Sequence, residues 1–321
     1  MLVDRPRLNK NEMNRVSETK ALDQLCCFRN IGSGYRLLVE VTSRCNRNCL
    51  HCFYKKHQVD LPVAFWLDLL NQISNTEVQI KKILITGGEP LLYNGLMDIL
   101  MFANSKNWDI DINTNGDFIS DEMLDVFYKI TNLEISISLT CDKNFNNYLT
   151  QTDSYQDTKH TIQKLIKKGI TVDVHSICSS SNWMCFNDFA DELYNYGVDT
   201  LTLLNYLPNT PNLGEKIYEI SNRDRQLLFS WLEAYRKCNK LAIRTRGFKI
   251  SEEEYGCDVL DKSIISINSR GYLSNCLQAS YEKDEKAEML NLSKVDFGKA
   301  FSLLNSSTMN KQRFCYRSLL K

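Results

Sequence analysis

The sequence predicts an α/β fold: a partial (β/α)6 barrel of parallel strands, TIM-like in plan, followed by a small hairpin-plus-helix domain. Two observations lead to this prediction. Between residues 36 and 245, runs rich in β-branched residues alternate with stretches whose apolar residues recur every three or four positions, as in helices that pack one face on a sheet. Beyond residue 245 the alternation ends, and a glycine turn joins two short β-rich runs. Alternating strands and helices form parallel sheets with right-handed crossovers, and six units are too few for an eight-fold barrel.

The expected elements follow one another in a regular order. Strands are expected at Arg36–Thr42, Lys82–Thr86, Ile110–Thr114, Leu133–Leu139, Thr171–Ile177 and Thr200–Tyr206. Helices are expected at Val63–Ser74, Leu91–Asn104, Ser120–Ile130, Asp153–Lys168, Trp183–Tyr196 and Asp224–Lys237. Ser263–Asn268 and Tyr272–Cys276 are expected to form a hairpin around Gly271, because a tight hairpin turn needs positive φ. Residues 281–321 have a helical pattern.

Length and composition indicate a globular chain with more than one domain. At roughly 100–200 residues per domain, the 321 residues divide into an N-terminal extension (1–35), the barrel (36–245) and a C-terminal domain (246–321). Lys+Arg and Asp+Glu are equal at 39 each, which excludes binding to nucleic acid or to an anionic membrane through net charge. No apolar run is long enough to span a membrane, and the first 30 residues are no secretory signal. We therefore expect a cytoplasmic protein with neither nucleic-acid nor membrane partners.

Polar residues alternate along several expected strands, although parallel strands are usually apolar on both faces. The pairs that share a face are Glu40 and Thr42, Asp111 and Asn113, Ser136 and Ser138, and Asp173 and His175. If these faces point inward, the strands enclose a polar lumen. The alternative is an antiparallel sheet with a solvent-facing side, which the intervening helices disfavour.

The 12 cysteines are unevenly distributed, and a reducing cytosol does not keep structural disulfides. Cys45, Cys49 and Cys52 directly follow the first strand, and three thiolates on one loop suit a soft metal site. Zinc would take His51 or His57 as its fourth ligand. A [4Fe–4S] cluster would use the three thiolates and leave one iron open. For the isolated cysteines the simplest interpretation is core packing.

A second motif, Gly87-Gly88-Glu89-Pro90, follows the second strand. Together with the CxxxCxxC triplet it resembles the radical S-adenosylmethionine (SAM) superfamily, over roughly residues 36–240. The resemblance implies a [4Fe–4S] cluster on the triplet and SAM at the GGEP motif. In that arrangement the glycines let backbone carbonyls approach the SAM ammonium group, Glu89 accepts a hydrogen bond from it, and Pro90 fixes the exit into the next helix. The alternative is an ordinary strand–helix turn.

Further SAM contacts follow from the same resemblance. Asn115 and Ser138 correspond to polar positions near the ribose or carboxylate of SAM, and His175 and Asn205 are expected to face SAM or substrate. Capping or filling the lumen is the alternative role for each. The resemblance also implies an electron donor such as flavodoxin or ferredoxin, and a 5′-deoxyadenosyl radical that takes hydrogen from the substrate. Cys141 and Cys178 follow the fourth and fifth strands, where a thiol could return that hydrogen; core packing is the alternative.

The last quarter of the chain holds another group of cysteines. Cys257, Gly271 and Cys276 are spaced as in the hairpin that opens SPASM and twitch extensions, and Cys315 stands where those extensions have a CxxC pair, with Ser318 in place of its second cysteine. This resembles a truncated twitch-like domain with one auxiliary iron–sulfur cluster. The alternative is that these cysteines are buried and bind no metal.

The expected function follows from this layout. Auxiliary-cluster extensions favour an enzyme that modifies a ribosomally synthesised peptide by a cross-link, a thioether or epimerisation. One alternative is a radical SAM dehydrogenase of a small molecule such as a sugar or aminoglycoside. A non-enzymatic, metal-bearing structural protein is a further alternative, which would leave the GGEP motif and the polar strand ends without a purpose.

Overall fold

The computed structural model describes residues 34–52, 56, 60–206, 218–238, 240–248, 264–274 and 290–305. Its strands are β1 (Tyr35–Thr42), β2 (Ile80–Gly87), β3 (Asp109–Thr114), β4 (Leu133–Ser138), β5 (Thr171–Cys178), β6 (Thr200–Asn205), β7 (Ala242–Arg246), β8 (Ile264–Ile267) and β9 (Leu273–Ser274). Its α-helices are α2 (Val63–Ser74), α3 (Leu96–Ser105), α4 (Asp121–Phe127), α5 (Lys143–Thr150), α6 (Tyr155–Lys167), α7 (Phe186–Tyr196), α8 (Asn222–Lys237) and α9 (Phe297–Asn305). Two 3-10 helices are η1 (Pro90–Leu92) and η2 (Trp183–Cys185).

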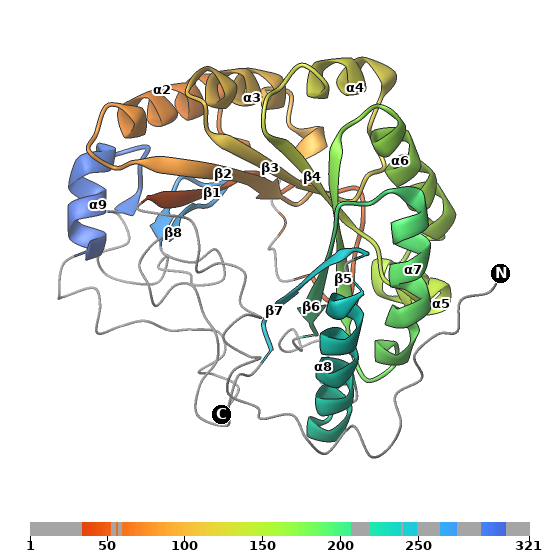
Figure 1. Cartoon of the computed structure of the whole chain (residues 1–321). Helices are drawn as coiled ribbons and strands as arrows, with labels where there is room; N and C mark the ends of the chain where they lie inside the picture. Colours follow the sequence, from red (N-terminus) through yellow and green to blue (C-terminus); the bar gives the residue numbers. More distant parts are fainter. Residues whose placement is uncertain are drawn as a thin grey trace.

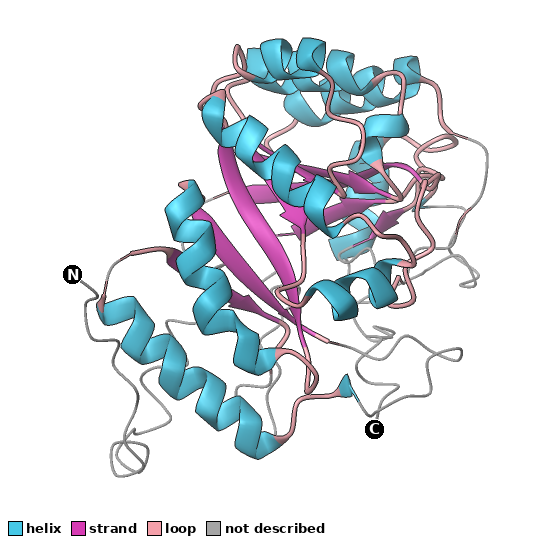
Figure 2. Ribbon diagram, turned by 90° about the vertical axis from the view of Figure 1, so that its right-hand side faces the viewer, coloured by secondary structure: helices cyan, strands magenta, loops and turns pink. Residues whose placement is uncertain are grey.

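The strands form one sheet in the order β7-β6-β5-β4-β3-β2-β1-β8-β9. Neighbours from β1 to β7 pair in parallel and follow chain order. The sheet is curved, and Figures 1 and 2 show helices along its outer side. This is the expected α/β partial barrel, and the alternative of an antiparallel sheet is wrong.

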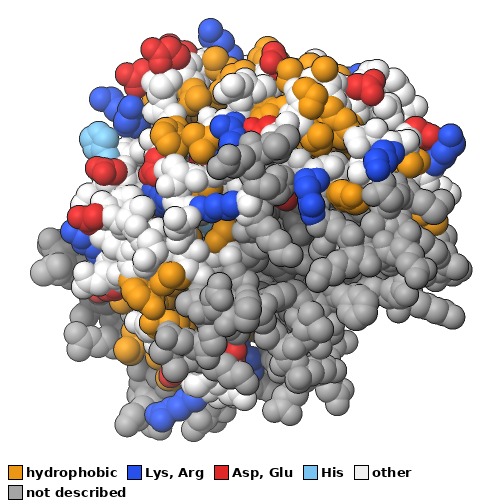
Figure 3. Space-filling view, turned by 180° about the vertical axis from the view of Figure 1, so that it is seen from behind, with side chains coloured by type: hydrophobic (Ala, Val, Ile, Leu, Met, Phe, Trp, Pro, Cys, Tyr) orange, Lys and Arg blue, Asp and Glu red, His pale blue; other side chains and the backbone are white. Residues whose placement is uncertain are grey.

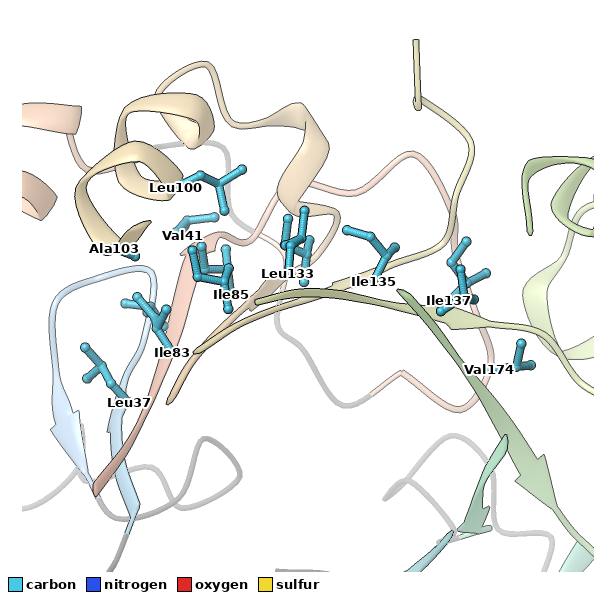
Figure 4. Close-up of a cluster of buried hydrophobic side chains, with 14 of the residues drawn as sticks. Leu37, Val41, Ile83, Ile85, Leu100, Ala103, Leu133, Ile135, Ile137 and Val174 are labelled. Carbon is cyan, nitrogen blue, oxygen red and sulfur yellow. The ribbon is translucent and has the colours of Figure 1, made fainter. Parts of the chain in front are cut away.

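The hydrophobic core lies between the sheet and its helices, because alternate residues of every strand point outward. Figure 4 shows these side chains along the strands, beneath Leu100 and Ala103 of α3. Leu37, Ile83, Ile85, Ile135 and Val174 are all fully buried there.

The opposite, inner face is polar, as the alternation in the sequence predicted. Asp111 and Asp173 are at most 2% exposed, and each is held by a hydroxyl from the next strand. Ser136 Oγ donates to Asp111 Oδ1 at 2.7 Å, and Thr202 Oγ1 donates to Asp173 Oδ2 at 2.8 Å. Burying these carboxylates is tolerated because their charges are hydrogen-bonded.

Two elements were not expected from the sequence. The strand β7 continues the barrel beyond six units by pairing in parallel with β6. The helix α5 follows β4, in a stretch to which the sequence analysis assigned no helix or strand.

The predicted hairpin is present in the described residues, and its place is informative. The strands β8 and β9 are antiparallel, and Gly271 between them has φ +81°. However, β8 also pairs in parallel with β1, so the hairpin extends the barrel sheet. The helix α9 contacts α2 and β9 at the same edge.

The surface agrees with the balanced composition. On the described part of the face in Figure 3, acidic and basic side chains are interspersed. Within the described ranges, none of the helices combines the length and hydropathy needed to span a bilayer.

Candidate active site

The loop after β1 carries the three clustered cysteines. Cys45, Cys49 and Cys52 are free thiols with partly exposed side chains, and the Cys52 amide donates to the Cys49 carbonyl at 3.1 Å. The Leu50 amide donates to the Leu149 carbonyl of α5 at 2.8 Å. The cysteine loop is therefore supported by α5, the helix that the sequence did not predict.

An ion pair between buried Arg47 and the more exposed Asp117 ties the same loop to the end of β3. Arg47 is 3% exposed, and its Nε donates to Asp117 Oδ2 at 2.8 Å while its Nη2 pairs with Asp117 Oδ1. Asn46 Nδ2 donates to Asp117 Oδ2 at 2.6 Å, and Asn115 Nδ2 donates to Asn46 Oδ1 at 2.8 Å. These contacts hold the cysteine loop beside Asn115, a predicted SAM contact.

Two positively charged side chains lie close to the thiols of the cysteine loop and affect the pKa of Cys49. Burial, together with the nearby Cys52 and Cys45, raises the pKa of Cys49 to about 11, and the charges of Arg47 and Lys56 oppose this. An iron cluster binds the deprotonated form. The two cations that oppose the shift would also offset the negative charge of a bound cluster.

Among the described residues, no group of three Cys, His, Asp or Glu side chains is arranged to hold a metal ion. Three thiolates on one loop could hold an iron–sulfur cluster, or a zinc ion with a fourth ligand. Burial lowers the pKa of His51 to about 4, so its ring is neutral; His57 lies outside the described residues.

The two glycines of the GGEP motif let the end of β2 lie directly against the loop from β1. The Gly88 amide donates to the Thr42 carbonyl, and the Glu89 amide donates to the Arg44 carbonyl, both at 2.8 Å. A Cβ added at Gly87 or Gly88 would lie 2.2 Å from one of these two carbonyl oxygens. The structure thus requires glycine here for backbone packing, a reason that is separate from the predicted approach of SAM.

Glu89 organises the neighbouring strand end. It is 1% exposed and accepts hydrogen bonds from Thr114 Oγ1 at 2.7 Å, the Asn115 amide at 2.8 Å and the Leu91 amide at 3.1 Å. Burial raises its pKa, and these three hydrogen bonds act against that shift. Pro90 is the first residue of η1, as its fixed φ favours.

The other predicted SAM or substrate contacts lie along the same edge. Ser138 is exposed at the end of β4, directly opposite His175 of β5. Asn205 Nδ2 donates to the Gly247 carbonyl at 3.2 Å, while its Oδ1 is buried without a partner in the structure described. The structure thus brings these residues to the carboxyl end of the sheet.

The two candidate hydrogen donors occupy a different environment. Cys178 is fully buried on the same face of β5 as Val172 and Val174, in the hydrophobic core. Cys141 is 9% exposed, and its Sγ donates to the Asn182 carbonyl at 3.3 Å. Burial raises the pKa of both thiols. This placement favours core packing for both.

The C-terminal cysteines Cys257, Cys276 and Cys315, together with Ser318, lie outside the described residues. The sequence did not indicate that Arg47 and Asp117 support the cysteine loop. Arg47 lies inside the cysteine triplet, but nothing in the sequence pairs it with a carboxylate 70 positions away.

Comparison with known proteins shows which families and structures this chain is similar to. The model described as the radical SAM superfamily matches residues 39–193. The tungsten-containing aldehyde ferredoxin oxidoreductase cofactor-modifying protein of Pyrococcus furiosus is 26% identical over 253 residues, 75% of this chain and 70% of the relative. The GTP 3′,8-cyclase of Helicobacter pylori is 24% identical over 292 residues, 88% of each chain.

The fold also matches solved structures. SuiB of Streptococcus suis bound to the precursor peptide SuiA has a TM-score of 0.71 at 16% identity, covering 88% of this chain and 67% of SuiB. SuiB bound to S-adenosylmethionine has a TM-score of 0.69 at 17% identity, covering 89% of this chain and 74% of SuiB. At this identity the likeness shows the fold alone.

Proposed function

We propose that this chain is a radical SAM enzyme, as the match of the radical SAM superfamily to residues 39–193 supports. We further propose that it modifies a ribosomally synthesised peptide by a cross-link, a thioether or epimerisation. Its cofactors are a [4Fe–4S] cluster and SAM. When bound and reduced, the cluster supplies the electron that splits SAM into methionine and a 5′-deoxyadenosyl radical, which takes a hydrogen atom from the substrate.

One observation carries the assignment of the site. The cysteine loop, the GGEP backbone and the end of β3 form a single hydrogen-bonded unit through Thr42, Arg44, Glu89 and Asp117. In our proposal Cys45, Cys49 and Cys52 hold the cluster. The backbone beside Gly87 and Gly88, with Asn115 and the exposed Ser138, holds SAM next to it. The residues of the chain thereby fix where the radical forms.

Two observations support a peptide as substrate. The fold neighbour SuiB was solved with a precursor peptide, and its likeness extends over 88% of this chain. The second observation is the group of cysteines at 257, 276 and 315, because many peptide-modifying enzymes carry an auxiliary cluster in a C-terminal extension. We propose that these three cysteines hold a second iron–sulfur cluster, that flavodoxin or ferredoxin delivers the electron, and that the enzyme works in the cytoplasm.

A small-molecule substrate is the second candidate. It is favoured by the GTP 3′,8-cyclase of H. pylori, which aligns over 88% of both chains, and by the cofactor-modifying relative from P. furiosus. A polar inner face with buried carboxylates would accommodate a nucleotide or sugar as well as a peptide.

The test is to purify the protein anaerobically, supply SAM and dithionite, and measure 5′-deoxyadenosine by chromatography. Replacing Cys45, Cys49 or Cys52 with Ala should reduce its formation to background, while Cys238→Ala, at an exposed cysteine, should leave it unchanged. Retained cleavage in a triplet variant would refute the assignment.

The substrate class needs a second measurement. Co-incubation of the loaded enzyme with the precursor peptide encoded beside its gene should change the mass of the peptide. A new product from GTP, with an unchanged peptide, would favour the small-molecule candidate. Cys257→Ala and Cys276→Ala should retain cleavage of SAM without substrate but stop product formation; unaltered product yield would make these cysteines structural.

A further inference from the structure

A buried carboxylate and a histidine lie together on the inner face of β5. Asp173 and His175 are two residues apart, so they point to the same side of the strand. His175 Nε2 lies 3.3 Å from Asp173 Oδ2, and their side chains are 6% and 0% exposed. Neither the cysteine loop nor the GGEP motif uses this pair.

Asp173 is held as an anion. Its Oδ2 accepts hydrogen bonds from Thr202 Oγ1 at 2.8 Å and from Arg244 Nη1 at 3.5 Å, while Oδ1 is buried without a partner in the part of the chain that is described. Burial alone would raise the pKa of Asp173, but His175, Thr202 and Arg246 outweigh burial and lower it.

An ionised carboxylate fixes the tautomer of its histidine partner. Because the carboxylate can only accept, the proton of neutral His175 lies on Nε2, and the lone pair lies on Nδ1. Nδ1 makes no hydrogen bond to any described residue. The residue directly opposite His175 in β4, Ser138, is exposed, so solvent reaches the strand next to the pair.

We propose that His175 binds the substrate by accepting, at Nδ1, a hydrogen bond from a proton-donating group such as a peptide amide, a hydroxyl or a thiol. Asp173 is the positioning residue that orients the ring and holds the proton of the neutral tautomer on Nε2. The inference rests on the proposed function only in placing the substrate in the lumen. The charged groups near the pair are Glu134 of β4, which contacts Arg244, and Arg244 and Arg246 of β7.

Asp173→Asn is the decisive variant. An Asn amide can donate to Nε2, so it favours the opposite tautomer and places the proton on Nδ1, while the shape of the side chain is kept. With the precursor peptide as substrate, kcat/KM should fall roughly 10- to 100-fold, as expected for a buried hydrogen bond left unmade. Cleavage of SAM without substrate is measured in parallel in the wild type and the variant, so that a defect at the cysteine loop is distinguished from a defect at His175.

Chemical modification shows which nitrogen of the His175 ring is unprotonated, and it does not require the enzyme to turn over. Diethyl pyrocarbonate modifies unprotonated imidazole nitrogens, and mass spectrometry of the treated holoenzyme resolves each of the chain's 4 histidines. In Asp173→Asn, His175 should be modified several-fold more slowly than in the wild type, with exposed His160 as the internal standard.

Thr202→Val is the matched control. It removes the other short hydrogen bond to Asp173 Oδ2 but keeps the carboxylate, so His175 should be modified at the wild-type rate. A faster reaction in Asp173→Asn, or equal slowing in both variants, would mean that Asp173 only stabilises packing and would overturn the inference. If the wild type leaves the peptide unmodified, the proposed function fails, while the modification rates still test the tautomer.

Discussion

Gly88 stands where two backbone segments meet, and its missing side chain has a measurable consequence. A Cβ at this position would lie 2.2 Å from the Arg44 carbonyl oxygen and 2.7 Å from that of Ser43. Both are backbone atoms of the loop that leads to Cys45, so they cannot move without shifting the loop. Gly88 therefore controls the position of Cys45, the first of the three cysteines that we propose as cluster ligands.

We expect Gly88→Ala to lower the iron content of the purified protein by more than half and to destabilise it by about 1–3 kcal/mol, the usual cost of overpacking. Iron analysis and thermal unfolding measure the two effects. Gly298→Ala in α9 is the control, because its Cβ would meet only Asp296 Oδ1 at 3.4 Å. Equal iron in the two variants would contradict the proposed role of Gly88.

At the scale of single residues, the sequence located the cysteine loop but not the residues that support it. Cys45, Cys49 and Cys52 stand out as proposed cluster ligands because a short motif places three thiols on one loop. The contacts of Arg47 with Asp117, and of Asp173 with Arg244, span 70 and 71 positions. Contacts that distant depend on strand register, which a single sequence does not specify.

Among the elements, α5 is capped at its N-terminus and contacts the cysteine loop near its C-terminus. Asp142 caps the helix by accepting a hydrogen bond from the Phe145 amide at 2.6 Å. The other end of α5 offers the Leu149 carbonyl to the Leu50 amide, between two of the cysteines. Loss of the cap should therefore loosen the support of the loop.

We expect Asp142→Ala to reduce stability by about 1 kcal/mol, as other lost N-caps do, and also to slow cleavage of SAM several-fold. Ser120→Ala removes the equivalent cap of α4, which does not contact the loop, so it should show the same stability loss with normal cleavage. Thermal unfolding and 5′-deoxyadenosine formation distinguish the two outcomes. Equal rates of SAM cleavage in the two variants would show that α5 does not support the active site.

Most helices and strands were predictable from periodicity, and the exceptions have physical causes. The sequence of α5, KNFNNYLT, is rich in asparagine, which has low helix propensity, so capping and packing decide its structure. The five residues of β7 follow α8 without a clear turn signal, and they form a strand because β6 offers an open edge.

On the scale of the whole molecule, a buried carboxyl group connects the first strand to the C-terminal hairpin. Ser269 Oγ donates to Glu40 Oε1 at 3.0 Å, although the residues are 229 positions apart. Burial raises the pKa of Glu40 from 4.5 to about 7, and the hydrogen bonds from Ser269 and the charge of Arg270 act against this. The folded state therefore binds a proton more tightly than the unfolded state does.

This pKa makes stability depend on pH. The contribution of Glu40 is fully present below pH 4.5 and is lost as the pH rises through 7, a change of about 3 kcal/mol. Glu40→Gln should therefore be more stable than the wild type at pH 8 and similar to it at pH 4.5, by thermal unfolding. Glu122→Gln, at an exposed site, should show no such pattern. A constant difference between Glu40→Gln and the wild type at both pH values would rule out this titration.

The parallel pairing of Arg36 in β1 with Ile264 in β8 also means that β1 is synthesised well before the strand that pairs with one of its edges. The opening strand leaves the exit tunnel long before the strand that will cover its flank has been translated. At about 5–20 residues per second, its backbone donors and acceptors stay uncovered for roughly ten to fifty seconds. During that interval the nascent chain offers a template for wrong strand partners, close in the sequence to the three cysteines of the loop.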